Sequence, residues 1–351
     1  MKKKISLQLT LDYELFGDGT GDVNREQIIP TNHLMDICEL YGAKLTVYFE
    51  YGQYIAFEKY SDINGDLKKA NQAILNQLKQ LIAKGHDVQF HLHPTWLDAS
   101  YTAESGFVLS KELYDITFLS EDKMVQILTE GKKFLESNLK PINSSYQCLA
   151  FRAGAWSAID SGKLVSALLK SGYRVDSTVA KGAHLKSGYG CFDFREVSDK
   201  PCWYAKEDIC KESSALDCIF ELPILTRRTK LAPLFYISNK RSFINSIVSD
   251  FYKTKVTDQG ASIVSKLSKI LSRDYVLADF NFMPAKTLLK IIKKEVNSTS
   301  VSKYPIPITL IGHSKTSYNN DDLHLFFRTL EKKYTVDYDT VSSYYMKHIE
   351  K

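Results

Sequence analysis

The feature that most constrains the fold is an alternating stretch near the start of the chain, ISLQLTLDYEL at residues 5–15. Apolar and polar residues take turns along it, which is the period of a β-strand with two different faces. The polar face begins with Ser6 and ends with Asp12 and Glu14. Strands of an open parallel sheet are usually apolar on both faces. A polar face therefore favours a barrel whose strands point polar groups inward.

Strand and helix patterns alternate along most of the chain. Further strands are predicted at KLTVYFEY, HDVQFHLH, QCLAFRAGAW, YRVDSTV, DCIFELPIL and IPITLIGH. Helices are predicted over residues 25–42, 66–85, 120–140, 160–173, 284–296 and 321–334. Because strands that alternate with helices pair in parallel, we predict an α/β fold, a distorted, TIM-like (β/α) barrel of about seven parallel strands. A single domain is expected over residues 1–351, with an irregular insertion at about 180–275 and C-terminal helices.

Composition and charge exclude several classes of protein. Hydrophobic residues make up 44% and charged residues 25% of the 351, which is ordinary for a globular protein. The formal net charge of +5 is mild, and no basic block accompanies a binding motif, so no nucleic-acid partner is expected. No apolar run reaches about 18 residues, so no membrane span is expected. The N-terminus lacks a signal-peptide pattern and the six cysteines include no C-x-x-C, which favours a cytoplasmic location.

Acidic and histidine residues gather at the predicted strand ends, where barrels of this kind build their active sites. Asp12 and Glu14 share one side of their strand, and two carboxylates repel each other unless a cation or a proton separates them. His91 and His93 share a face of a later strand, so both rings can converge on one ion. We predict that Glu14, His91 and His93 bind a divalent metal ion, with Zn²⁺ as the first choice. The alternatives are a solvated Glu14 and histidines satisfied in the core.

Two more strand ends carry groups that suit acid–base chemistry. Arg152 ends an apolar strand, and an inward arginine needs a carboxylate partner, for which Asp12 is the nearest candidate. A purely structural ion pair would explain the same residues. His313 ends a late apolar strand and is a candidate acid or base.

The order of four short motifs resembles the polysaccharide deacetylase superfamily, the NodB-homology domain of carbohydrate esterase family 4. The family begins with a strand ending T-F-D-D-G, where this chain has TLDYE. It continues with G-H-E-hydrophobic-x-x-H, here GHDVQFHLH, and with an F-R-x-P-like strand end, here FRAGAW. It closes with an apolar strand ending in histidine, here LIGH. The resemblance spans residues 5 to 315 and implies a NodB-type barrel. The HLHP and GHSK variants are similar to divergent deacetylases of capsule and lipopolysaccharide gene clusters.

The resemblance implies a role for each matching residue. Asp12 matches the general base of the family, and Arg152 matches the arginine that holds this base. His313 matches the general acid. His91 matches the first of the two metal-binding histidines.

Two positions depart from the family pattern. The second aspartate of the family, a metal ligand, aligns with Tyr13, but variants that read D-x-D or D-x-E place the ligand at Glu14. The second histidine usually lies four residues after the first, where this chain has Thr95. His93 is the available substitute.

Four further residues are predicted to contact substrate. Tyr13 stands within the first motif. Asp176 either binds substrate, orients a histidine or makes a turn. Trp96 and Trp156 either form a wall on which a sugar stacks or pack in the core.

These assignments predict a metal-dependent hydrolase that removes an N-acetyl or other acyl group from a sugar during the biosynthesis of a cell-surface polysaccharide. The ion would activate a water molecule, Asp12 would take its proton and His313 would protonate the leaving amine. Without an export signal, the expected substrate is a small-molecule sugar, or one linked to a nucleotide or a lipid. The alternatives are another C–N amide hydrolase on the same barrel and a catalytically inactive carbohydrate-binding barrel.

Overall fold

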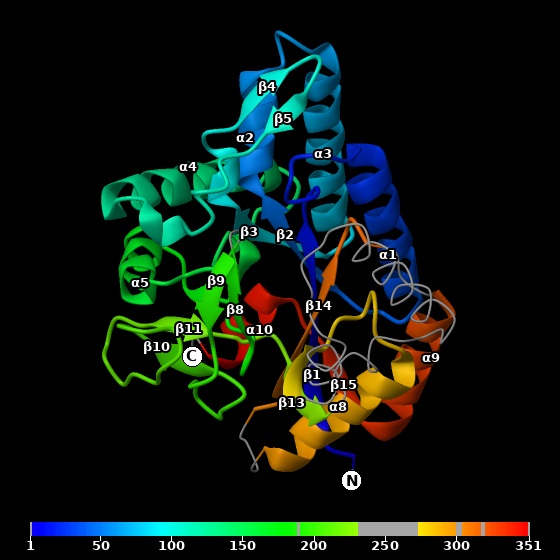
Figure 1. Cartoon of the computed structure of the whole chain (residues 1–351). Helices are drawn as coiled ribbons and strands as arrows, with labels where there is room; N and C mark the ends of the chain where they lie inside the picture. The colour runs from blue at the N-terminus through cyan, green and yellow to red at the C-terminus, as the bar shows by residue number, and fades with distance from the viewer. Residues whose placement is uncertain (1, 188–189, 231–272, 300–303, 317–319, 350–351) are drawn as a thin grey trace, which may run out of the picture.

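The computed structural model describes residues 2–187, 190–230, 273–299, 304–316 and 320–349 and shows a curled sheet wrapped by helices (Figure 1). The main sheet contains β1 (Lys4–Tyr13), β2 (Leu45–Glu50), β3 (Asp87–Leu92), β6 (Ala150–Ala153), β7 (Val175–Asp176), β10 (Trp203–Ala205), β11 (Ile219–Glu221), β14 (Ile306–His313) and β15 (Thr335–Tyr338). Three two-stranded sheets pair β4 (Ser100–Thr102) with β5 (Gly106–Val108), β8 (His184–Ser187) with β9 (Gly190–Asp193), and β12 (Thr226–Lys230) with β13 (Arg273–Leu277).

Seven parallel strands form the hydrogen-bonded path β11-β7-β6-β3-β2-β1-β14, as the prediction of a distorted barrel requires. An antiparallel strand, β10, extends the β11 edge. One further parallel strand, β15, pairs with the first residues of β1, and β2 pairs with the later residues of β1. The sequence analysis did not identify β15, which spans only four residues. The predicted α/β barrel class is confirmed.

The barrel is distorted because β14 and β11 do not pair directly in this sheet. Extended backbone around Leu225 and Ala278 lies between them instead. The amide of Leu225 donates to the carbonyl of Thr309 at 2.8 Å, and the amide of Ala278 donates to the carbonyl of Leu225 at 2.8 Å. The predicted irregular insertion contains the β8–β9 hairpin and strands β10 to β12. Its residues 231–272 lie outside the described part of the chain.

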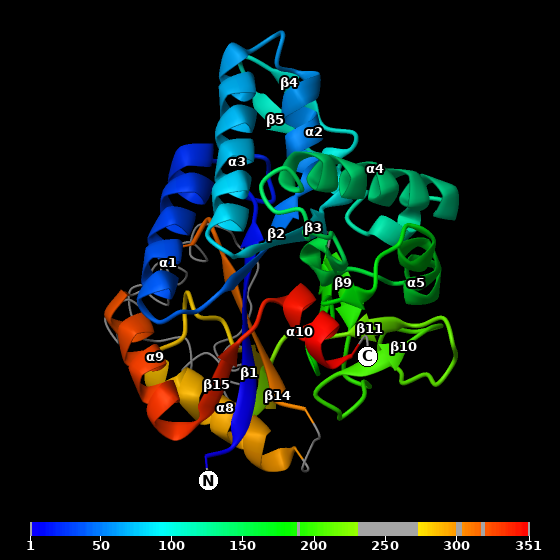
Figure 2. The same ribbon diagram turned by 180° about the vertical axis from the view of Figure 1, so that it is seen from behind.

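Helices cover the outside of the sheet, as the two opposite views show (Figures 1 and 2). They are α1 (Ile29–Leu40), α2 (Tyr51–Lys59), α3 (Gly65–Ala83), α4 (Glu121–Leu139), α5 (Ser161–Lys170), α8 (Ala285–Ser298), α9 (Asn320–Lys333) and α10 (Val341–His348). The apolar faces of α1 to α5, α8 and α9 pack on the leucine, isoleucine and valine side of the strands in one large core. The apolar residues of α10 instead form a second, smaller cluster with Tyr48, Val175 and Phe220. Within the described ranges, no helix has both the length and the apolar character needed to cross a bilayer.

The polar face of β1 is buried, and hydrogen bonds satisfy most of its groups. The Oγ of Ser6 donates to Asp339 at 2.6 Å, and the side-chain amide of Gln8 donates to Ser6 at 2.6 Å. The hydroxyl of Thr10 donates to the carbonyl of Leu310 at 2.7 Å. Buried polar groups need such partners. This column leads along β1 to Asp12 at the carboxyl end of the strand.

Candidate active site

Five parallel strands bring polar side chains to one edge of the sheet. Asp12 on β1 lies opposite His313, the last residue of β14. His91 on β3 lies between Glu50, the last residue of β2, and Arg152 on β6. Because the strands are parallel, their carboxyl ends meet at the same place. The predicted clustering of groups from distant parts of the sequence is therefore a direct result of the sheet register.

Glu14, His91 and His93 form a compact cluster at the carboxyl ends of β1 and β3. The Oε2 atom of Glu14 lies 2.7 Å from Nε2 of His93 and 3.4 Å from Nε2 of His91. Glu14 and His91 are buried, whereas the side chain of His93 is 19% exposed. The structure thus brings together all three residues predicted to bind metal.

The orientation of the His91 ring fits a metal ligand. Its Nδ1 atom lies 2.8 Å from the carbonyl oxygen of Arg152, which can only accept a hydrogen bond. Nδ1 therefore carries the proton, and the lone pair lies on Nε2. This buried Nε2 has no hydrogen-bond partner among the described residues. Metal-binding histidines are commonly fixed through their other ring nitrogen in this way, so the residues present fit a divalent ion.

Lys315, which the sequence analysis missed, neutralises the other oxygen of Glu14. Its Nζ atom lies 2.7 Å from Oε1 of Glu14 and 3.1 Å from the carbonyl oxygen of Leu15. Burial alone would raise the pKa of Glu14, but Lys315 and the two histidines hold this pKa well below its usual 4.5. Glu14 is therefore a carboxylate whose Oε2 faces the histidines.

Glu50 is a further member of the cluster that the sequence analysis missed. Glu14, Glu50, His91 and His93 each offer a ligand atom, and these atoms all lie within 4.8 Å of one another. Burial, with Glu14 close by, raises the pKa of Glu50 to about 8, although hydrogen bonds to its carboxylate oppose the rise. The alternation of β2 could have identified Glu50, because it lies two residues after the inward-facing Tyr48 and so shares its face of the strand.

Arg152 holds Asp12 in the interior of the barrel. Its Nη1 atom donates to Oδ1 of Asp12 at 2.6 Å, and Nη2 donates to the hydroxyl of Thr10 at 3.0 Å. The guanidinium also bonds Ser177 and lies 4.1 Å from the ring centre of Tyr48. Burial would raise the pKa of Asp12, but Arg152 and two nearby histidines lower it below 3.8. The predicted ion pair is present, and it keeps Asp12 ionised.

The imidazole of His313 lies between two carboxylates. Its Nε2 atom is 3.7 Å from Oδ2 of Asp12, and its Nδ1 atom is 3.9 Å from Oδ2 of Asp279. The backbone amide of His313 donates to the side chain of Asn281 at 2.8 Å, which fixes the end of β14. Burial raises the pKa of Asp279 to about 6, while His313 and two backbone amides oppose the rise. The sequence analysis missed Asp279, although it follows an apolar run.

The segment after β6 turns sharply beside His93. A Cβ atom on Gly154 would lie 2.5 Å from Cγ of His93, so only glycine fits there. Ala155 and Trp156 both have positive φ values, of 52° and 53°, which are strained for residues other than glycine. The partly buried Trp156 ring lies 5.8 Å from that of Phe192. Its predicted contact with a sugar stays a prediction.

Three predicted substrate contacts do not lie at the cluster. Tyr13 is fully buried on the opposite face of β1, and its hydroxyl donates to Gln77 of α3 at 2.7 Å. Trp96 is 3% exposed and packs edge-on against two phenylalanine rings, so it belongs to the core. Asp176 is fully buried beside Glu221, and burial raises the pKa of both carboxyls. We correct these three assignments, because buried side chains bonded within the core are not available to a substrate.

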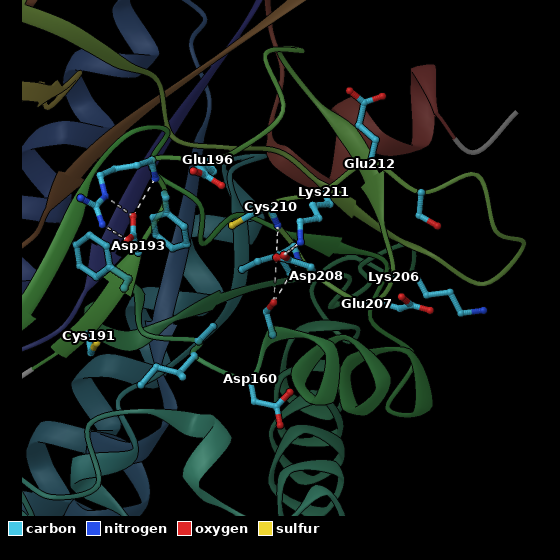
Figure 3. A pocket seen from close by; sticks show the side chains of 18 of the residues that line it. Asp160, Cys191, Asp193, Glu196, Lys206, Glu207, Asp208, Cys210, Lys211 and Glu212 are labelled. Carbon is cyan, nitrogen blue, oxygen red and sulfur yellow. Dashed lines mark hydrogen bonds and ion pairs between the residues drawn. The ribbon is translucent and has the colours of Figure 1, made fainter.

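A cavity of about 1260 Å³ lies away from the cluster, between β9 and the loop after β10 (Figure 3). Four of its charged side chains form two ion pairs. Arg195 donates to Asp193 at 2.8 Å, and Lys211 lies 3.2 Å from Asp208. None of the predicted site residues lines this cavity.

Comparisons with known proteins bear on the fold. No protein-family model and no curated protein sequence matches the chain. Among solved structures, a 4-alpha-glucanotransferase from Thermococcus litoralis matches 99% of this chain with a TM-score of 0.50 and 13% identity. This chain covers 41% of the glucanotransferase, and the likeness is one of fold alone.

Two further structures align with lower TM-scores. A structure from Mycobacterium smegmatis that is described as a polysaccharide deacetylase has a TM-score of 0.49 and 12% identity. The alignment covers 97% of this chain and 89% of that one. A CE4 family pseudoenzyme from Bacillus anthracis has a TM-score of 0.39 and 12% identity, over 98% of this chain and 69% of that one. Neither reaches a TM-score of 0.5.

Proposed function

We propose that the protein is a metal-dependent hydrolase that removes an N-acetyl or other acyl group from an amino sugar. The observation that carries this proposal is the convergence of Glu14, His91 and His93 beside the Asp12–Arg152 pair. One carboxylate and two imidazoles are a common ligand set for catalytic zinc. The order of the sequence motifs, which resembles that of polysaccharide deacetylases, supports an acylated sugar as the substrate.

Glu14, His91 and His93 would hold the ion, with Oε2 of Glu14 and Nε2 of each histidine as the ligand atoms. A bound Zn²⁺ would supply Lewis acidity, which lowers the pKa of water and polarises a carbonyl group. Lys315 keeps Glu14 ionised before any ion arrives. The backbone carbonyl of Arg152 keeps the Nε2 lone pair of His91 directed into the cluster.

Asp12 and His313 would carry the proton transfers of the hydrolysis. Asp12 is ionised and fixed by Arg152, so its Oδ2 atom can accept a proton from the attacking water. His313 lies 3.7 Å from that oxygen and can donate a proton to the nitrogen of the leaving amine. Asp279 lies on the other side of the imidazole and can stabilise its protonated form. The expected products are a carboxylic acid, acetate in the simplest case, and a free amino sugar.

The source of the sugar is a finer proposal. A sugar linked to a nucleotide or a lipid, used to build a cell-surface polysaccharide, agrees with the order of the sequence motifs. The partly exposed Trp156 follows two residues after Gly154, which lies against His93, and it is our candidate to stack on such a sugar.

The test combines metal analysis with product detection. The purified protein should contain about one equivalent of a divalent metal, lose activity on chelation and regain it with Zn²⁺. Acetate release from N-acetylated sugars, including nucleotide-linked ones, should be measured in parallel. A purified protein that contains no divalent metal and binds sugar unchanged after chelation would contradict the proposal and favour the inactive carbohydrate-binding barrel. Metal-dependent cleavage of formamides or cyclic amides alone would favour another amide hydrolase.

A further inference from the structure

We propose that Glu50 is a positioning residue that fixes His93 as the second metal-binding histidine, an inference that rests on the proposed function. Histidines at i and i+2 do not both belong to the same strand here, because β3 ends at Leu92. His93 therefore lies beyond the ladder that fixes His91. Something other than strand pairing must hold its backbone in place.

The carboxylate of Glu50 supplies this support. Its Oε2 atom accepts a hydrogen bond from the backbone amide of His93 at 2.7 Å. Its Oε1 atom accepts one from the amide of Gly52 at 2.8 Å and so caps the N-terminus of α2. Glu50 is only 1% exposed. One buried carboxylate thus ties the turn that carries His93 to the start of a helix.

The surroundings leave the turn little freedom. The carbonyl oxygen of His93 accepts a hydrogen bond from the amide of Trp96 at 3.1 Å. A Cβ atom on Gly52 would lie 2.8 Å from Oε1 of Glu50 and 2.9 Å from Cβ of Trp96. Gly154 also lies against His93, because a Cβ atom on it would lie 2.7 Å from Cα of His93. Hydrogen bonds therefore fix both the amide and the carbonyl group of His93, and Gly154 packs against its backbone. The ring of His93 contacts Glu14.

The same contacts argue against Glu50 as a fourth ligand. Both of its oxygens already accept hydrogen bonds from backbone amides, so each oxygen has a partner in the protein. Such support is typical of residues that orient ligands, and its loss commonly lowers metal affinity 10- to 100-fold. A positioning role makes one specific prediction: Glu50 acts through His93.

A double-mutant cycle tests that prediction. The affinity for Zn²⁺ would be measured by competition with a chelator in the wild type, Glu50→Gln, His93→Ala and the double variant. The visible spectrum of the Co²⁺-loaded protein would report the ligand geometry. Glu50→Gln keeps the shape but replaces one acceptor oxygen with an amide donor facing a backbone amide. We expect it to lower the affinity about 10- to 100-fold and to have almost no further effect once His93 is alanine.

The matched control is Asp87→Asn at the opposite end of β3. Asp87 is also buried, and its carboxylate accepts hydrogen bonds from Gln89 and Ser342 at 2.8 and 2.7 Å. This variant should keep the metal affinity of the wild type. Glu50→Asp provides a second variant if Glu50→Gln does not fold, because it keeps the carboxyl group but is too short to reach both amides.

Each outcome decides a different point. Equal losses from Glu50→Gln with and without His93 would show that Glu50 is itself a ligand and would overturn the positioning role. Unchanged affinity and spectrum in folded Glu50→Gln would also overturn it. A wild-type protein that binds no divalent ion would instead overturn the proposed function.

Discussion

Two clusters of histidine and carboxylate groups lie at opposite ends of β1. One contains Glu14, Glu50, His91 and His93, and the other contains Asp337, Asp339 and His348. Both satisfy the simple requirement that potential ligand atoms lie close together. They differ in what else contacts the carboxylates, and that difference separates a candidate active site from a structural one.

In the cluster near the start of β1, other side chains of the protein already bind the carboxylates of Asp337 and Asp339. Asp339 accepts a hydrogen bond from Ser6 at 2.6 Å and forms an ion pair with Lys347. Asp337 forms an ion pair with Lys4 at 2.9 Å, and His348 lies 3.9 Å from Asp339. Each carboxylate therefore has its own lysine. In the cluster at the other end, a single lysine contacts Glu14 and leaves its second oxygen to the two histidines.

Replacing one histidine in each cluster should give the largest contrast. We expect His91→Ala to lower the affinity for Zn²⁺ by at least about 100-fold, because it removes one of the three proposed ligands. His348→Ala should leave the metal content unchanged. Metal content after dialysis and chelator competition would measure both. Loss of metal in His348→Ala alone would reverse our assignment of the two clusters.

Replacing one aspartate at each end separates chemistry from stability. Asp12→Asn should keep the bond to Arg152 through its carbonyl oxygen but lower kcat about 10²- to 10⁴-fold, because an amide cannot accept the proton. Asp339→Asn should lower the free energy of unfolding by about 1–3 kcal/mol through its buried hydrogen bonds, with little effect on kcat. Steady-state assays and urea titrations would measure these effects. Near-wild-type turnover in Asp12→Asn would exclude it as the base.

Apart from Glu50, the sequence predicted those parts of the site that lie on strands or one residue beyond a strand end. Strand alternation places Asp12 on the inner face, and the need of a buried arginine for a carboxylate pairs it with Arg152. Glu50 could have been found by the same alternation. Asp279 and Lys315 could not, because each reaches the site from a segment whose position depends on how the barrel closes. Tyr13 was misassigned because a motif alignment does not distinguish the two faces of a strand, whereas the period of two does.

Asp279, one of the two carboxylates beside His313, should make the stability of the folded protein depend on pH. Burial raises the pKa of Asp279 from an ordinary 3.8 to about 6. The folded protein then holds this proton more tightly than the unfolded chain, so stability falls as the pH rises from about 4 to about 6. The contribution is at most about 3 kcal/mol, since one pKa unit corresponds to about 1.4 kcal/mol. Asp279→Asn should flatten this part of the profile in urea titrations from pH 4 to 8. An unchanged slope would show that Asp279 does not titrate there.

Removing the lysine from each cluster should produce the smallest and most informative contrast. Lys315 lies 2.7 Å from Glu14, so its charge repels an ion bound at the other oxygen. A lysine and a divalent ion about 6 Å apart interact with about 5–6 kcal/mol at an effective dielectric constant of 20. Partial exposure of Lys315 and the loss of its support for Glu14 reduce the gain. We expect Lys315→Met to increase Zn²⁺ affinity roughly tenfold, and Lys347→Met, next to Asp339, to leave it unchanged. Weaker binding in Lys315→Met would mean that Lys315 mainly orients Glu14, because the loss of orientation would then outweigh the relief of repulsion.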